Sequence, residues 1–205
     1  MEHKVKVLAQ YMPEKAAMLI AKWIDVYKCE FKISKSRDSK FGDYRAPYQG
    51  LSHRISVNYN LNPYAFLVTT VHEFAHLETY NQWGNKVKPH GIEWKSNFKK
   101  MMLPFFELGI FPLDIERALA KYLMNPAASS CTDQGLFSVL KKYDIQQDNG
   151  LVNISELAEN QLFEIKAGRR FKKLGKNRTR DQCLEIATGR MYLFSPLAEV
   201  KVIAG

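Results

Sequence analysis

The sequence predicts an α+β protein of 205 residues in two parts. Residues 1–128 carry several segments with apolar residues at helical spacing, and short alternating segments lie between them. Residues 129–205 instead carry short extended segments separated by glycine-containing turns. We therefore expect a short sheet flanked by helices in the first part and a small basic β-meander in the second.

The first helix and the strands of the first part are predicted by their periodicity. Residues 13–27 have an amphipathic pattern whose apolar positions share one face: Ala16, Leu19, Ile20, Trp23 and Tyr27. Residues 29–34 alternate, with Phe31 and Ile33 on one side, and indicate a strand. Two further strands are predicted at residues 41–47 and 55–59.

A well-specified helix follows these strands. Asn62 is a good N-cap, and Pro63 suits the first helical position. The residues that recur beyond them at helical period are Phe66, Leu67, Thr70, Val71, Phe74 and Leu77. His72, Glu73 and His76 lie on the border of this stripe, so we expect one side of the helix to pack and the adjoining side to face a cleft.

The segment His72-Glu73-Phe74-Ala75-His76 has the pattern H-E-x-x-H. One helical turn separates its histidines, so both imidazoles project from the same face, beside Glu73. Two neutral imidazoles can hold a zinc ion, and the carboxylate can accept a proton from water at the metal. The pattern is therefore typical of a zinc-dependent peptidase with Glu73 as its general base.

A zinc site of this kind needs a third protein ligand and an open position. His90 is the histidine that follows His76, and it stands where a second helix, residues 92–102, is expected to begin. Glu93 is the alternative, because some peptidases of this class take a glutamate from a following helix. The metzincin pattern is absent, since its next histidine would fall at Gln82.

Prolines delimit the helices that come next. Pro104 is expected to end the helix after His90, and Pro112 to open another. The residues at helical spacing after Pro112 are Leu113, Glu116, Leu119, Ala120 and Leu123. Asn125 and Pro126 are expected to end that helix, close to the boundary between the two parts. A short helix is predicted at residues 136–143.

The two histidine segments together resemble the SprT family of metalloproteases, whose eukaryotic relative is Spartan. They read His72-Glu73-x-x-His76 and His90-Gly91-x-x-Trp94-Lys95. The two strands before them, at residues 40–45 and 53–58, resemble that family as well. The resemblance implies a zincin-like protease fold, with His72, His76 and His90 as zinc ligands and Glu73 as the base. It also implies a role at DNA, because Spartan-type proteases degrade proteins crosslinked to DNA.

Composition indicates an intracellular protein with an anionic partner. The N-terminus lacks the apolar run of a secretion signal, and no segment approaches transmembrane length. Cys29, Cys131 and Cys183 are odd in number and far apart, so we expect the reducing cytoplasm rather than a disulfide framework. The net charge of +9 favours nucleic acid, and not a membrane, as the partner, although such charge also serves solubility.

The second part is predicted to contain four strands, at residues 162–166, 169–174, 178–186 and 191–194. The predicted turns between them are residues 167–168, 175–177 and 188–189. The expected core consists of Phe163, Ile165, Phe171, Leu184, Ile186, Tyr192 and Phe194. In the SprT family this place often holds a zinc ribbon with two cysteine pairs. Because this chain has no C-x-x-C, we expect one zinc per chain, at the histidines.

A dense basic segment runs through this predicted meander. The residues assigned to nucleic-acid binding are Arg169, Arg170, Lys172, Lys173, Lys176, Arg178 and Arg180, with no acid among them. Such a hairpin suits phosphates, and Phe171 or Tyr192 can stack on a base if exposed. The alternative is a solvated hairpin whose aromatic residues are buried.

The functional hypothesis is zinc-assisted hydrolysis of proteins associated with or crosslinked to DNA. Tyr44, Tyr48, Tyr59 and Tyr80 are candidates to stabilise the oxyanion. The alternative is a nucleic-acid-binding adaptor with a structural or weakly active zinc site, against which the intact Glu73 argues. A zinc hydrolase of small amides is a third hypothesis, against which the basic second part argues.

Overall fold

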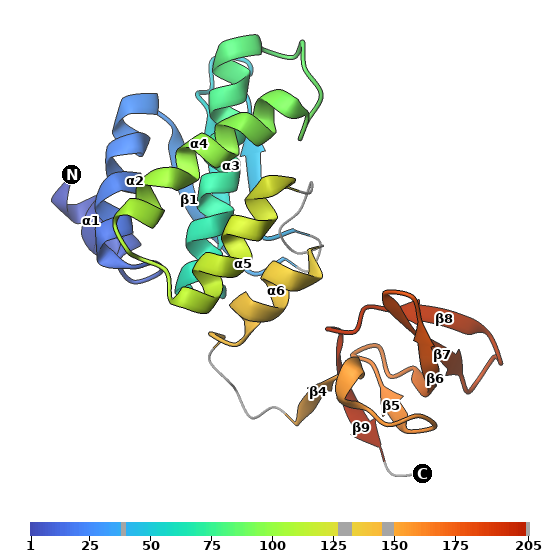
Figure 1. Cartoon of the computed structure of the whole chain (residues 1–205). Helices are drawn as coiled ribbons and strands as arrows, with labels where there is room; N and C mark the ends of the chain where they lie inside the picture. The colour runs from blue at the N-terminus through green and yellow to red at the C-terminus, as the bar shows by residue number, and fades with distance from the viewer. Residues whose placement is uncertain (38–39, 127–132, 145–149, 204–205) are drawn as a thin grey trace. The chain divides into compact units, whose positions relative to one another are not determined.

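A computed structural model describes residues 1–37, 40–126, 133–144 and 150–203. The chain divides into two compact units, Met1–Ile145 and Gln146–Gly205. The first combines helices with a three-stranded sheet, and the second is a six-stranded sheet with one short 3-10 helix (Figure 1). The predicted α+β class is therefore confirmed.

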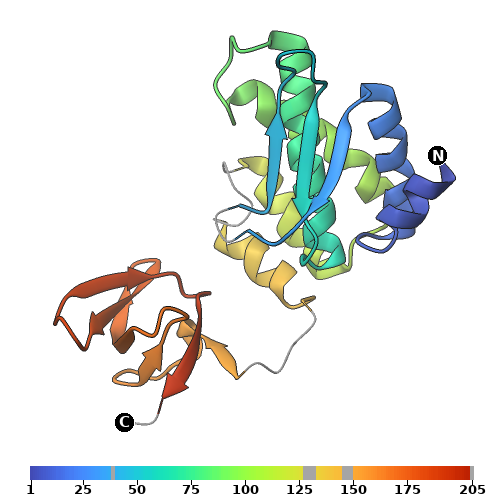
Figure 2. The same cartoon turned by 180° about the vertical axis from the view of Figure 1, so that it is seen from behind.

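The sheet of the N-terminal unit contains β1 (Glu30–Ser34), β2 (Gly42–Arg45) and β3 (Arg54–Asn58), in the order β1-β3-β2. β1 runs parallel to β3, and β2 runs antiparallel to it. Each strand matches a predicted one. Phe31, Ile55 and Tyr44 share a level across the sheet and belong to the main core. Figure 2 shows the opposite face of the sheet, with the helices behind it.

Helix α3 (Pro63–Trp83) packs against β2 and β3 on one side and against α4 (Ile92–Glu107) on another. As predicted, the Asn62 side chain caps α3, accepting hydrogen bonds from the backbone N–H groups of Tyr64 and Ala65. The helix is buried on more sides than its apolar stripe indicated, because every residue from 65 to 75 is buried. None of the described helices combines the length and apolar character that crossing a bilayer requires.

Two other helices depart from the predictions. α2 (Glu14–Tyr27) has nearly the expected bounds, but α1 (Glu2–Leu8) precedes it and was not predicted. The prediction that Pro104 ends α4 was wrong, since the helix continues to Glu107. The physical reason is the last turn's packing: Phe105 is fully buried and its ring lies 5.5 Å from that of Trp23.

The boundary between the units lies later than the predicted division after residue 128. α5 (Leu113–Met124) is followed by α6 (Gln134–Lys141), whose Leu136 and Leu140 are buried in the core of the N-terminal unit. Asn62 Nδ2 also donates to the carbonyl of Leu140, at 2.8 Å. These contacts attach α6 to the N-terminal unit. The predicted boundary residues 127–132, with Cys131, lie outside the described residues, whereas Cys29 and Cys183 are buried free cysteines.

The C-terminal unit confirms the four-stranded meander and adds two strands to it. The sheet order is β4-β9-β5-β6-β7-β8. Its elements are β4 (Leu151–Asn153), the 3-10 helix η1 (Ile154–Glu156), β5 (Leu162–Glu164), β6 (Arg170–Asn177), β7 (Arg180–Glu185), β8 (Met191–Phe194) and β9 (Glu199–Ile203). β9 pairs with both β4 and β5, so a strand that the sequence did not reveal lies inside the sheet.

The hairpin of β6 and β7 corrects two predictions. Residues 175–177 belong to β6 rather than to a turn, since Asn177 pairs with Arg180. The register also shifts between Lys173 and Gly175. The inward face of β7 carries the alternating residues Asp181, Cys183 and Glu185, whereas the predicted core residue Ile186 is 50% exposed and Leu184 is only partly buried. The remaining predicted core residues do pack in this unit's core: Phe163, Ile165, Phe171, Tyr192 and Phe194.

Candidate metal centre

Three histidines from two segments of the N-terminal unit meet in one place. The Nε2 atom of His72 lies 3.2 Å from those of His76 and His90, and the latter two are 2.9 Å apart. Tetrahedral zinc with Zn–N bonds of about 2.0–2.1 Å separates its nitrogens by roughly 3.3 Å. The three atoms are therefore close to the spacing of three ligands, and they form the one potential metal-binding group found among the described residues.

Different backbone conformations bring these side chains together. Helix α3 places His72 and His76 one turn apart, as the spacing predicted. His90 lies just before α4 with a left-handed φ of 57°, which is uncommon for a residue other than glycine. Gly91 then forms the N-cap of α4. A Cβ at Gly91 would lie 2.9 Å from the carbonyl oxygen of Lys88, so this tight turn requires glycine.

Trp94 packs against all three histidines. It is fully buried in the first turn of α4. Its ring centroid lies 4.6 Å from that of His72, 5.3 Å from that of His76 and 4.7 Å from that of His90. Sequence reasoning gave this residue no role. The available signal was its position four residues after His90, one helical turn further on.

The environment keeps the imidazoles neutral. Burial lowers the pKa of His72 well below its usual value, and that of His76 to about 3, with the neighbouring histidines as the second cause. Burial also lowers the pKa of His90. Neutral imidazole is the form that binds metals. His72 Nδ1 is buried without a hydrogen-bond partner among the described residues, so the outer partner common for such ligands is not found there.

Glu73 lies against strand β2 rather than facing open solvent. Its side chain is buried, and a Cβ at Gly42 would lie 2.4 Å from Glu73 Oε1. The pKa of Glu73 is raised to about 8, first by burial and then by the nearby Asp43 carboxylate, while a hydrogen bond from the Tyr44 backbone opposes the shift. Gly42 thus makes room for the predicted base, a role that its position in the sequence did not indicate.

The tyrosines proposed as oxyanion stabilisers lie in different environments. Tyr44 stacks on His76, with ring centroids 6.2 Å apart, and its hydroxyl hydrogen-bonds His53 Nδ1 at 2.9 Å. Tyr80 lies beside Tyr44, at a centroid distance of 6.5 Å. Tyr48 and Tyr59 are 65% and 54% exposed and make no ring contact with the three histidines. Tyr44 is therefore the candidate nearest to the histidine cluster. The alternative ligand Glu93 does not belong to that cluster.

The basic segment of the C-terminal unit does not form one uniform surface. Lys173 is buried, and its Nζ donates to the carbonyls of Ile154 and Leu157 and lies 3.4 Å from Asp181 Oδ1. The prediction that Lys173 contacts nucleic acid is therefore wrong, because its ammonium group is used inside the unit. Lys173 lies two residues after the buried Phe171 on β6, so both side chains face the interior of the unit.

Other members of the segment also have internal partners. Arg169 forms an ion pair with Glu185 and lies over the rings of Phe171 and Tyr192. Arg170 pairs with Glu164 at 3.1 Å. Phe171 is fully buried, so it is not available to stack on a base.

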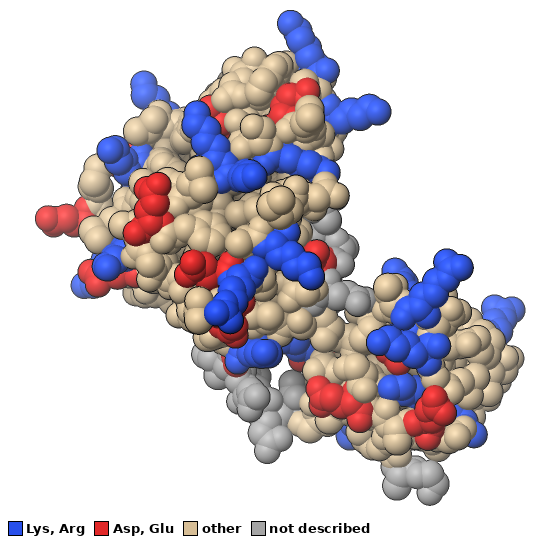
Figure 3. All heavy atoms as spheres, in the orientation of Figure 1, with Lys and Arg blue, Asp and Glu red and all other residues tan. Residues whose placement is uncertain are grey.

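Three members of the segment remain exposed at the hairpin end. Lys176, Arg178 and Arg180 form no ion pair with any described residue, and Lys172 is half-buried. In the view of Figure 3, lysine and arginine side chains lie over much of this unit, with acidic side chains between and below them.

Comparison of the chain with family models, curated proteins and solved structures finds no match.

Proposed function

We propose that this chain is a zinc-dependent endopeptidase of the SprT type, acting on proteins associated with or crosslinked to DNA. The observation that supports it best is the convergence of three neutral imidazole nitrogens, two of them from α3, the helix that also carries the buried Glu73. The fit to zinc rests on donor type and spacing, since three Nε2 atoms at 2.9–3.2 Å match a three-histidine ligand set.

In this proposal Glu73 does the proton transfer. Zinc at the histidines would polarise the scissile carbonyl and bring the pKa of water towards about 7. Glu73 accepts the proton of the attacking water and delivers it to the leaving amine. The contact with Gly42 and the Tyr44 backbone holds its carboxylate in place. The ionised form of Glu73 is favoured when a cation occupies the neighbouring site.

Strand β2 supplies a place for an extended substrate. In the described sheet it pairs only with β3, so its other edge is not used by a further strand. That edge adjoins the candidate site, because Gly42 and Tyr44 both contact Glu73. A peptide that adds to β2 through main-chain hydrogen bonds would bring an amide close to the base.

The DNA-related part of the proposal rests on charge and on the SprT resemblance. The chain carries a net charge of +9, and the exposed Lys176, Arg178 and Arg180 at one hairpin form no ion pair with the residues that the structure describes. Their phosphate contacts would hold the enzyme on nucleic acid without sequence preference. Binding to DNA in this way would bring the peptidase close to proteins that are bound to the same DNA.

The test is cleavage of a DNA-bound protein with and without DNA, by the wild type and by Glu73→Gln. The amide cannot accept the proton, so Glu73→Gln should keep zinc and lose about 10²–10⁴-fold in rate. Wild-type cleavage by this variant would overturn the assignment of the base. Zinc retention with no cleavage by the wild type in either condition would instead favour the adaptor hypothesis.

A further inference from the structure

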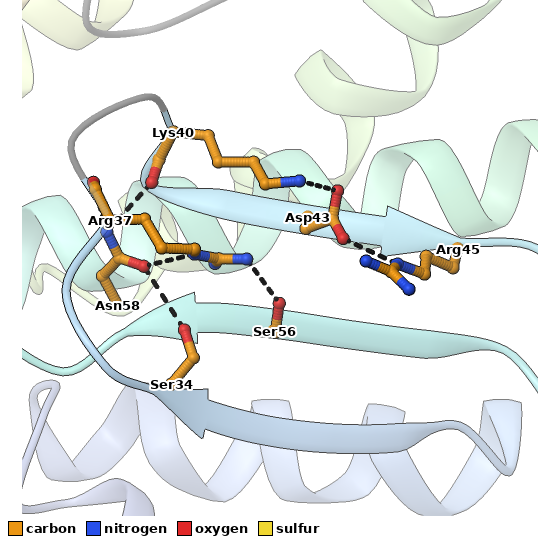
Figure 4. Close-up of polar contacts among 7 residues, drawn as sticks. All are labelled: Ser34, Arg37, Lys40, Asp43, Arg45, Ser56 and Asn58. Atoms are coloured by element: carbon orange, nitrogen blue, oxygen red, sulfur yellow. Dashed lines mark hydrogen bonds and ion pairs between the residues drawn. The ribbon is translucent and has the colours of Figure 1, made fainter.

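A polar groove lies on the face of the three-stranded sheet that is turned away from the histidines. Its volume is about 310 Å³. Its charged lining residues are Glu30, Lys32, Arg37, Asp43, Arg45 and Arg54. Figure 2 looks onto this face, and Figure 4 shows side chains from all three strands and the β1–β2 connection meeting on it.

Strand alternation separates this groove from the candidate metal centre. Gly42 and Tyr44 face α3: a Cβ at Gly42 would meet Glu73, and the Tyr44 ring stacks on His76. Asp43 and Arg45, which alternate with them, therefore point to the opposite side. Across the sheet, Asp43 pairs in register with Ser56, and Ser56 with Lys32, so these residues share the outer face.

Cations outnumber acids in the groove, and the central acid already has partners. Lys32, Arg37, Arg45 and Arg54 face two carboxylates, those of Glu30 and Asp43. Asp43 accepts a hydrogen bond from Lys40 Nζ at 2.7 Å and one from Arg45 Nε at 2.9 Å. Burial raises the pKa of Asp43, but the hydrogen bonds and charges of Lys40 and Arg45 together hold it below its usual value.

Two buried guanidinium donors in the groove have no acceptor among the described residues: Arg37 Nη2 and Arg54 Nε. Arg37 is held in place by its other nitrogens, with Nε donating to Asn58 Oδ1 at 2.9 Å and Nη1 to Ser56 Oγ at 3.2 Å. Asn58 is itself fixed through Nδ2, which donates to the carbonyls of Arg37 and Lys40. An unsatisfied buried donor of a charged group is costly, so an acceptor at this position stabilises the site.

We propose that this groove binds a phosphate group. A phosphate offers several charged oxygens. These suit the guanidinium groups of Arg37, in the β1–β2 connection, and Arg54, in β3, together with the nearby Ser56 hydroxyl, better than a single neutral acceptor does. The phosphate group could come from a nucleic-acid backbone or from a small ligand, either inorganic phosphate or a mononucleotide. Both sources present the same charged oxygens. The proposal goes beyond proteolysis, because the groove lies on the opposite face of the sheet from Glu73.

Isothermal titration calorimetry of the full chain at low salt tests this, with inorganic phosphate in one arm and a short single-stranded oligonucleotide in the other. The variants are Arg54→Gln and Lys32→Gln, neither of which removes a hydrogen bond between described residues. Arg178→Gln, in the C-terminal unit, is the matched control. Each groove variant should bind about 10-fold more weakly where a charge-assisted contact is lost, and the control should bind inorganic phosphate as the wild type does.

The two arms distinguish the source of the phosphate. Binding of inorganic phosphate that weakens in Arg54→Gln supports a free phosphate or mononucleotide. Binding of the oligonucleotide alone, weakened by Arg54→Gln, supports a nucleic-acid backbone. If neither ligand binds, or if Arg54→Gln and Lys32→Gln bind as tightly as the wild type, the groove is not a phosphate site. No result here depends on zinc or cleavage, so failure of the proposed protease function leaves the test intact.

Discussion

In the N-terminal unit, histidines that are up to 18 residues apart in sequence meet with their Nε2 atoms within 3.2 Å. In the C-terminal unit, basic residues that are neighbours in sequence are separated onto different faces. Lys173 is buried, whereas Lys172 is half-buried and Lys176 is exposed. Helical spacing in the sequence thus correctly predicted that His72 and His76 lie together. The high density of basic residues on the β6–β7 hairpin did not correctly predict one continuous basic surface.

The reason lies in what each local pattern determines. Residues four apart on a helix share a face wherever the helix packs. A strand residue faces the same side as the residue two positions away, and Lys173 stands two positions after the buried Phe171. A charged residue on a strand is therefore assigned to solvent only when the residues two positions away also face solvent.

The largest expected effect concerns the buried lysine. Lys173→Met removes the partner of Asp181 and the donor to two carbonyls, and should lower the free energy of unfolding of its unit by about 3–5 kcal/mol. Lys176→Met, on the same strand but exposed, should change it by no more than about 0.5 kcal/mol. Thermal and denaturant unfolding measure both. Equal stability of the variants, with DNA affinity lost only in Lys173→Met, would return Lys173 to the contact surface.

The next prediction concerns the glycine beside the base. Gly42→Ala places a Cβ 2.4 Å from Glu73 Oε1 and 2.8 Å from Thr69 Cγ2, so the carboxylate must move. Displacement of a catalytic group by about 1 Å can cost about 10²-fold in rate, and we expect a loss of this order with zinc retained. Gly135→Ala in α6 is the control, since its Cβ meets only Asp133 Oδ1, at 3.2 Å. Peptidase assays decide, and unchanged cleavage by Gly42→Ala would show that Glu73 does not act from this position.

The smallest effect concerns the exposed hairpin cations. Neutralising Arg178 and Arg180 together should flatten the slope of log DNA affinity against log salt by about two units, one per phosphate contact. Arg170→Gln should change the slope less, because that guanidinium already pairs with Glu164. Fluorescence anisotropy over a salt series measures the slopes. A steep slope that survives the double substitution would move the DNA contact away from this hairpin.

Much of the N-terminal unit was predictable because its signals are local. The Asn62 cap, the helix that carries His72 and His76, and the strands before it follow from spacing and capping. The contact of Gly42 with Glu73 was not predictable, because it depends on how β2 packs against α3. Strand β9 was missed for a similar reason: its pairing partners, β4 and β5, are distant in sequence.

Zinc content, measured by elemental analysis of the purified chain, tests the central claim most directly. The wild type should carry about one zinc per chain, since a single three-histidine site is proposed. His90→Ala should lower that occupancy sharply, whereas Glu93→Ala should leave it unchanged because Glu93 lies outside the cluster. A wild type without zinc, or a Glu93→Ala variant that loses zinc while His90→Ala keeps it, would contradict the account. Two zincs per chain would show that the C-terminal unit holds a metal site as well.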